Sequence, residues 1–144
     1  MAIYVVDSSV IIDYLVAGPY TLHSIALFNS FSITSDNDAL IVPEFCLVEC
    51  TNVIWKNVRF QGLDVGEAQR IHRYLRRLPL KRVPVKAVLN QSLKIGLLHQ
   101  LAIYDSVFIA LTQRTGCPLI TLDQKQARAA MVEGLEVIPL TRFN

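Results

Sequence analysis

The sequence predicts an α/β protein, a three-layer α/β/α sandwich around a central, mainly parallel sheet. Short, continuously apolar and β-branched segments recur along the chain, which is typical of strands that are buried on both faces. Segments with the features of helices separate them, so strands and helices alternate. With 144 residues, 52% of them hydrophobic and 18% charged, the chain is long enough for a full core. We expect a single domain over residues 1–144.

In the first half, apolar runs indicate strands, Ser and Pro residues mark helix starts, and Gly marks a helix end. The expected elements are a strand at 3–6, a helix at about 10–16 with Ser8 or Ser9 as N-cap, a helix at 21–31, a polar loop at 34–38, a strand at 40–42, and a helix that starts at Pro43 and runs to about Phe60 before Gly62.

In the second half, Asp64 and Glu67 resemble a capping box with Asp in place of Ser or Thr, which predicts a helix from there to about Leu78. The remaining expected elements are a strand at 81–83, a helix from Pro84 to about Leu98, a helix at 104–114 before Gly116, a strand at 119–121, a helix at 124–131 and a strand at 137–140.

Charge and composition restrict the classes of function. The net charge is +2, but eight basic residues and no acidic ones lie between Ala68 and Tyr104, which leaves a balance of −6 elsewhere. Such a basic flank suits a polyanionic partner. No apolar run approaches the roughly 18 residues of a membrane helix, and no signal segment opens the chain, so we expect a soluble protein with no membrane partner. Three cysteines form no disulfide framework, which fits the cytoplasm, and Cys46 and Cys50 are expected to be buried and structural.

Four acidic residues lie where a carboxylate is hard to justify by folding alone. Asp7 ends the run IYVV, Asp123 follows the run PLITL, Glu49 lies inside a mostly apolar helix, and Asp105 opens an apolar one. Each has a structural alternative as a helix cap or as a dipole-stabilising acid. A buried carboxylate costs several kcal/mol unless it is paired or bound to metal, so four of them together favour a shared divalent cation.

Helical spacing places one polar stripe on the expected helix at 43–60. Glu49, Asn52 and Lys56 follow one another at i, i+3 and i+7, among apolar neighbours. Further along the chain, Arg70, Arg73 and Arg77 share a helical face with the same spacing. We predict Lys56 and these three arginines as phosphate contacts, with simple solvent exposure as the alternative for each arginine.

With these acids in this order, the chain resembles the PIN-domain ribonucleases, and in particular the VapC-type toxins of type II toxin–antitoxin systems. The matching residues span nearly the whole chain in the family's order: VVDSSVIIDYL at 5–15, the pattern P-x5-E-x2-N from Pro43 to Asn52, YDSVFIAL at 104–111 and LITLD at 119–123. The resemblance implies the three-layer fold, RNA cleavage with Mg²⁺ or Mn²⁺, a cognate antitoxin and a homodimer. It implies Asp7, Glu49, Asp105 and Asp123 as catalytic residues and metal ligands, with Ser9, Asn52 and Thr121 in support.

Two other functions remain open from the residues. A parallel α/β domain with aspartates at strand ends can also be a phosphatase or a receiver-like domain, although a receiver needs paired acids after its first strand, where this chain has one. The second alternative is a non-catalytic PIN-like module that binds RNA. In the ribonuclease, the carboxylates would hold Mg²⁺ or Mn²⁺ as oxygen ligands, and their mutual repulsion should raise their pKa values.

Overall fold

The structure of the chain is a computed structural model, and it describes residues 2–32 and 37–144. Within these residues five strands form one parallel sheet in the order β3-β2-β1-β4-β5, which confirms the predicted fold class. The strands are β1 (Ile3–Val6), β2 (Ala39–Pro43), β3 (Leu80–Val83), β4 (Leu119–Ile120) and β5 (Val137–Ile138). The chain adds strands to one side of β1 and later to the other, so the strand order reverses there. In open parallel sheets, ligands bind at such a reversal, beyond the carboxyl ends of the strands.

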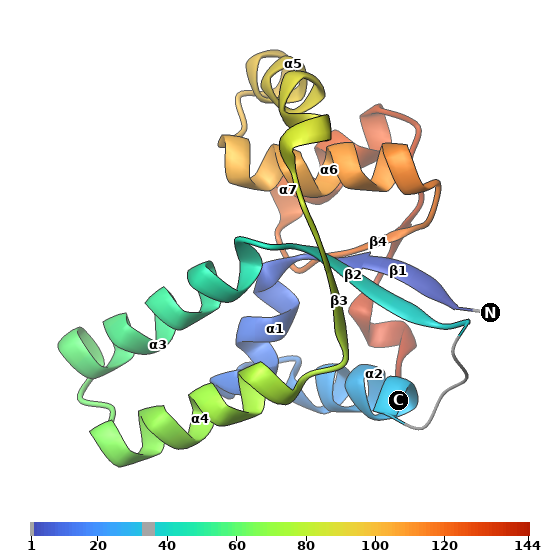
Figure 1. Cartoon of the computed structure of the whole chain (residues 1–144). Helices are drawn as coiled ribbons and strands as arrows, with labels where there is room; N and C mark the ends of the chain where they lie inside the picture. The colour runs from blue at the N-terminus through green and yellow to red at the C-terminus, as the bar shows by residue number, and fades with distance from the viewer. Residues whose placement is uncertain (1, 33–36) are drawn as a thin grey trace.

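Helices cover both faces of the sheet (Figure 1). One group, including α1 and α2, lies on one face, and α5 and α6 lie on the other. The helices are α1 (Ser8–Leu15), α2 (Thr21–Ser32), α3 (Cys46–Gln61), α4 (Val65–Arg77), α5 (Leu89–His99), α6 (Ile103–Thr115) and α7 (Gln124–Val132), with single 3₁₀ turns η1 (Lys86–Val88) and η2 (Leu140–Arg142). α3 and α4 pack against each other as an antiparallel pair that extends away from the sheet.

The core lies between the sheet and the helices. Val5 and Val6 of β1 and Leu119 and Ile120 of β4 have no exposed surface. α6 is buried on nearly all sides, as its apolar sequence predicts, because it packs across β1, β2 and β4. Full burial of such an aliphatic side chain stabilises the fold by roughly 1.5–3 kcal/mol. The buried centre of the sheet therefore supports the side chains at its carboxyl edge.

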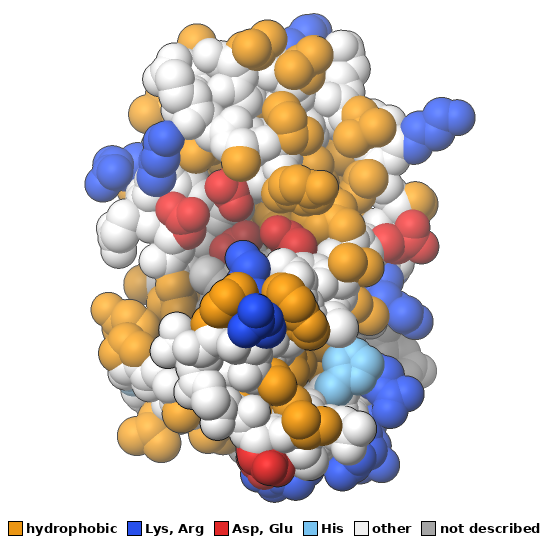
Figure 2. Space-filling view, turned by 90° about the vertical axis from the view of Figure 1, so that its left-hand side faces the viewer, with side chains coloured by type: hydrophobic (Ala, Val, Ile, Leu, Met, Phe, Trp, Pro, Cys, Tyr) orange, Lys and Arg blue, Asp and Glu red, His pale blue; other side chains and the backbone are white. Residues whose placement is uncertain are grey.

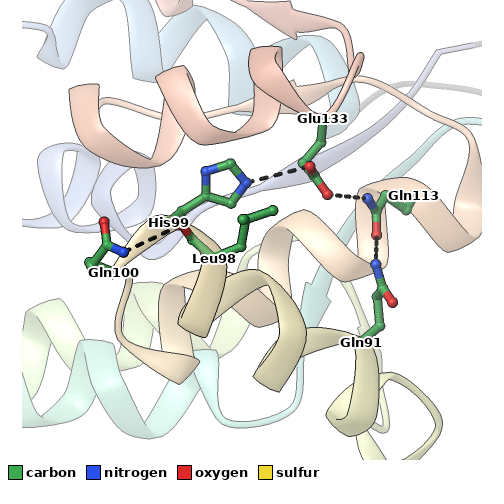
Figure 3. Close-up of polar contacts among 6 residues, drawn as sticks. All are labelled: Gln91, Leu98, His99, Gln100, Gln113 and Glu133. Atoms are coloured by element: carbon green, nitrogen blue, oxygen red, sulfur yellow. Dashed lines mark hydrogen bonds and ion pairs between the residues drawn. The ribbon is translucent and has the colours of Figure 1, made fainter.

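Polar side chains connect α5, α6 and the residue that follows α7 (Figure 3). Gln91 of α5 donates to Gln113 of α6 over 3.1 Å, and Gln113 donates to Glu133, just beyond α7, over 3.4 Å. The other oxygen of Glu133 lies 3.4 Å from Nε2 of His99 at the end of α5. These contacts join α5, α6 and the end of α7 to one another.

The structure corrects three local predictions. Pro43 does not start a helix but ends β2, where its missing N–H is not needed because Glu44 N–H donates to the Val83 carbonyl over 3.0 Å. Pro84 does not start a helix either: Val83 still pairs with Pro43, so the chain must first leave the sheet, and α5 follows only after η1. The N-cap of the first helix is Asp7, whose carboxylate accepts from Ser9 N–H, rather than Ser8 or Ser9.

Other helix ends follow the predictions. Gly62 and Gly116 end α3 and α6 in the left-handed conformation, with φ of 72° and 71°. Asp64 caps α4 by accepting from Glu67 N–H, whereas the Glu67 side chain pairs with Arg70 instead of completing a capping box. Of the predicted polar loop at 34–38, residues 34–36 lie outside the described residues.

No single helix in the described ranges is long and apolar enough to cross a membrane. α6 and the segment Lys86–His99 reach that length and composition only as a pair bent by 117°.

Candidate active site

All four predicted acids lie at or near the carboxyl edge of the sheet. Asp7 follows β1 directly, and its N–H donates to the Ile120 carbonyl at the end of β4 over 2.9 Å. Asp123 lies three residues beyond Ile120 and caps α7. Asp105 and Glu49 lie in the first turns of α6 and α3. Four elements that are far apart in sequence therefore each contribute one carboxylate.

Asp7 is the most enclosed of the four, with 5% of its surface exposed. Its Oδ2 accepts from Ser9 N–H over 3.1 Å and from the Thr121 hydroxyl over 3.3 Å. Its Oδ1 accepts from Nε2 of Gln126 over 3.2 Å. Burial raises the pKa of Asp7 above its ordinary value, the negative charge of Asp123 raises it further, and the hydrogen bonds from Ser9 and Gln126 oppose the rise. The carboxylate is thus held in one orientation, yet it lacks a positive partner within the described residues.

Glu49 is half-buried and turned toward the other acids. The Ser8 hydroxyl donates to its Oε1 over 2.8 Å and lies 3.2 Å from the Cys46 sulfur. Burial is the main cause that raises the pKa of Glu49, and the charges of Asp7 and Asp105 add to it. Glu49 therefore shares one electrostatic environment with acids from β1 and α6.

Asp105 completes the electrostatic connection between the four acids. Burial raises its pKa first, followed by repulsion from Asp7 and Asp123, while Lys125 lowers it. Asp123 accepts from Gln126 N–H over 3.1 Å through Oδ1 and so combines a helix cap with a place in the cluster. The predicted rise in pKa is confirmed for Asp7, Glu49 and Asp105.

Two of the three predicted supporting residues lie against this cluster. The hydroxyls of Ser9 and Thr121 are 3.5 Å apart, Ser9 accepts from Leu122 N–H and Thr121 accepts from Asp123 N–H, both over 3.0 Å. They fix the turn after β4 against the start of α1. Asn52 is exposed on α3 and makes no hydrogen bond to the four acids within the described part of the chain.

Two polar contributors were missed by sequence reasoning. Gln126 is fully buried and contacts Asp7, and it lies three residues after Asp123, on the first turn of α7. Ser8 is buried and orients Glu49, although the sequence suggested it only as a helix cap. A polar residue one turn into a helix that follows a strand-end Asp is the pattern that could have indicated Gln126.

The surface around the acids carries both apolar and basic side chains. Figure 2 shows Asp and Glu side chains gathered in a band across the middle of one face, beside hydrophobic ones, with Lys and Arg side chains directly below. Lys56 is exposed on α3, the helix that also carries Glu49. On α4 the arginines at 70, 73 and 77 are exposed and, with Tyr74, line a hollow of about 190 Å³.

The carboxylates do not stand in a closed coordination shell. Among residues 2–32 and 37–144, no group of three or more His, Cys, Asp or Glu side chains is close enough to hold a metal ion as it stands. The donor chemistry nevertheless fits a hard cation, because the cluster offers only carboxylate, hydroxyl and amide oxygens. Burial is the main cause of the raised pKa values, and repulsion between the acids, which a cation would relieve, adds to it.

Comparisons with solved structures support the fold. PAE2754 of Pyrobaculum aerophilum is 19% identical, with a TM-score of 0.73 over 99% of this chain and 94% of that one. VapBC-1 of nontypeable Haemophilus influenzae is 16% identical, with a TM-score of 0.65 over 96% and 98%. A toxin–antitoxin complex of Klebsiella pneumoniae is 15% identical, with a TM-score of 0.53 over 88% and 89%. At these identities the likeness concerns the fold.

The family itself is identified by sequence. No curated protein sequence matched the chain. Residues 4–131, which include all four acids, match the PIN domain. The chain therefore belongs to the PIN domain family.

Proposed function

We propose that the protein is a metal-dependent endoribonuclease and the toxin of a toxin–antitoxin pair. The observation that carries the proposal is the convergence of four carboxylates from β1, α3, α6 and the end of β4, three of them with raised pKa values. PIN domains are generally nucleases, which agrees with this site. Phosphodiester hydrolysis needs oxygen ligands for a cation that can offset the charge of the phosphate.

Mg²⁺ or Mn²⁺ fits the donor set best. Asp7 and Asp105 would be the primary ligands, and Glu49 and Asp123 would be further ligands or would orient water. The bound ion supplies Lewis-acid activation of a water molecule and neutralises negative charge on the scissile phosphate. Because no coordination shell is formed among the described side chains, the carboxylates would have to close on the ion.

The residues of the chain itself prepare this site. Ser9 and Thr121 hold one oxygen of Asp7, and Ser8 holds one oxygen of Glu49, so rotation of both carboxylates is restricted. The buried setting of Asp7 strengthens its interaction with a cation, because the effective dielectric is lower than in water. Lys125 lies near enough to Asp105 to lower its pKa and could also contact a phosphate.

RNA would be bound mainly through its phosphates. Lys56 is the predicted contact nearest to Glu49 in sequence, and it is exposed. The arginines of α4 are exposed as well, although Arg70 donates to Glu67 over 3.0 Å and stacks on Tyr74 at 5.7 Å from the ring centre. Arg73 and Arg77 are therefore the freer candidates in the part of the chain that the structure describes.

An apolar groove between α3 and α4 is the proposed docking surface for the antitoxin. It has a volume of about 480 Å³. Trp55 and Val65 on its two sides are 56% and 59% exposed, and Arg73 and Arg76 also line it. An amphipathic segment with apolar residues on one face and acidic residues on the other would complement both the groove and its cations. We propose such a segment of the cognate antitoxin as the occupant.

A second apolar surface is the proposed homodimer interface. Leu89, Leu93 and Leu97 follow one another at i, i+4 and i+8 on α5 and are 46%, 51% and 71% exposed. A contiguous leucine stripe of this kind favours association between identical copies. Sedimentation analysis of the wild type and of Leu93→Glu would test it, and a wild type that remains monomeric at high concentration would contradict it.

A non-catalytic RNA-binding PIN module is the alternative, and the open coordination shell favours it. Cleavage of a defined, end-labelled RNA with Mg²⁺, Mn²⁺ or EDTA separates the two functions. We expect cleavage by the wild type that requires the metal ion and is lost in Asp105→Asn. Equal cleavage by both proteins would reject the proposed site. A wild type that binds RNA but neither cleaves it nor binds Mn²⁺ would support the non-catalytic RNA-binding module.

A further inference from the structure

The side chain of Gln126 has no role in the proposed function so far, yet it lies at the centre of the acidic cluster. Gln126 is in the first turn of α7 and has no exposed surface. Its backbone N–H donates to Asp123, so the helix cap itself fixes where the side chain begins. A glutamine that is completely buried must find partners for both ends of its amide, or the fold is destabilised.

The NH₂ group of Gln126 is fully used. Nε2 donates to Oδ1 of Asp7 over 3.2 Å and to the backbone carbonyl of Asp105 over 3.0 Å. One side chain from α7 therefore bridges the carboxylate that follows β1 and the first turn of α6, which carries Asp105. These are the two acids proposed as primary ligands, and no other side chain in the described ranges hydrogen-bonds to both residues.

The other end of the amide is unpartnered. Among the described residues, Oε1 of Gln126 is the one buried side-chain nitrogen or oxygen atom without a hydrogen-bond partner. Turning the amide over does not solve this, because Oε1 would then face the Asp7 carboxylate and the Asp105 carbonyl, which are both acceptors. The orientation of the amide is thus determined by its partners, and the free acceptor belongs to the site.

Packing alone does not account for this residue. A methionine or leucine would fill a similar volume and would remove the unpaired Oε1, but it would take the amide donor away from Oδ1 of Asp7. Unpaired buried polar atoms are concentrated at functional sites, where the requirements of function outweigh those of stability. The bridge between the two acids supplies such a function, since ligand orientation is commonly set by the hydrogen-bond partners of the ligands.

We propose that Gln126 is a positioning residue that fixes Asp7 relative to Asp105 for a shared divalent cation, and that its free Oε1 accepts a hydrogen bond from a water molecule in the occupied site. This inference rests on the proposed function of the four acids as a cation site. It assigns to α7 a second contribution, in addition to the Asp123 carboxylate.

The test is Mn²⁺ binding by wild type, Gln126→Met and Gln124→Met, measured by calorimetry and by the rise in melting temperature that Mn²⁺ causes. Gln124 is exposed on the same helix and provides the matched control. We expect Gln126→Met to weaken Mn²⁺ binding by roughly 10-fold or more, as is usual when a ligand loses its supporting hydrogen bond. Its melting temperature without metal should fall by roughly 3–10 °C, because Oδ1 of Asp7 loses its donor, and the protein should stay folded. In RNA cleavage, kcat should fall while KM is retained.

The other possible results separate the positioning role of Gln126 from the proposed function. Wild-type Mn²⁺ affinity in folded Gln126→Met would overturn the positioning role and leave the proposed function intact. No Mn²⁺ binding by the wild type would reject the proposed function and this inference with it. Should Gln126→Met fail to fold, Gln126→Asn keeps the polar group but is one methylene too short to span both acceptors. Loss of the fold in both variants would show a structural role instead.

Discussion

Replacing Asp7 by Asn should make the metal-free protein more stable while it abolishes activity. Asp7 caps α1 by accepting a hydrogen bond from Ser9 N–H, and Asn is an equally good N-cap, so the cap survives. The substitution removes a negative charge that is 95% buried in a cluster with Asp123 and two other acids. If Asp7 served only the fold, its loss would be neutral or destabilising.

The magnitude follows from two opposing effects. A buried carboxylate carries a penalty of several kcal/mol, which the amide avoids. With the cap kept, the oxygen that accepts from Gln126 becomes an NH₂ group, and the loss of that hydrogen bond costs about 1–2 kcal/mol. A net gain of about 1–3 kcal/mol remains at pH 8, which corresponds to a rise in melting temperature of roughly 3–10 °C for a domain of this size.

The effect should depend on pH in a defined direction. The pKa of Asp7 is raised in the folded protein, so the protonated form is favoured there. Its contribution to stability is fully present below the unfolded value of about 3.9 and is lost as the pH rises through the folded value. The stability advantage of Asp7→Asn should therefore be absent near pH 4 and grow toward pH 8.

Urea denaturation in EDTA at a series of pH values measures this difference. Saturating Mn²⁺ should reverse the order, since ligand at 1,000 times its Kd stabilises the wild type by about 4.1 kcal/mol, which exceeds the advantage of the variant, and the variant binds the ion weakly. A metal-free Asp7→Asn protein that is less stable than the wild type at pH 8 would refute the reasoning.

Three further perturbations test other parts of the account. Ser8→Ala frees Glu49 and should lower kcat roughly 10-fold with little effect on KM for RNA; unchanged kcat would contradict it. Gly96→Ala places a Cβ 2.9 Å from the Leu101 carbonyl, so unfolding should become easier by about 1–3 kcal/mol in urea, and an unchanged midpoint would contradict the packing of α5 on α6. Charge reversal of Arg70, Arg73 and Arg77 on α4 should weaken RNA binding and make the affinity depend less steeply on salt concentration. An unchanged salt dependence would exclude these arginines from the RNA contact surface.

The sequence singled out these four acids because each one ends, interrupts or opens an apolar run. Parallel strands bring their carboxyl ends to one edge, so Asp7 and the Asp123 region had to approach each other once the fold class was known. Glu49 was indicated by its place on an otherwise apolar helix. These inferences needed only local pattern and topology.

The supporting contacts could not be derived in the same way. Gln126 lies in a short helix with ordinary polar residues around it, and only the packing of α7 against α6 and β5 shows that its side chain is buried. Pro43 illustrates the same limit for the fold: its sequence fits both a helix start and a strand end, and pairing with Val83 selects the strand. Where local sequence preferences fit two structures equally well, tertiary contacts determine which structure forms.

The most direct measurement is the anomalous scattering of Mn²⁺ in crystals of the wild type. The account predicts one or two peaks within about 2.0–2.6 Å of carboxylate oxygens of Asp7 and Asp105, with Glu49 or Asp123 as a further ligand or bound through water. The peaks should disappear in Asp7→Asn crystals. A wild-type protein without a peak among these acids, or with its only peak elsewhere, would contradict the central claim that they form a cation site.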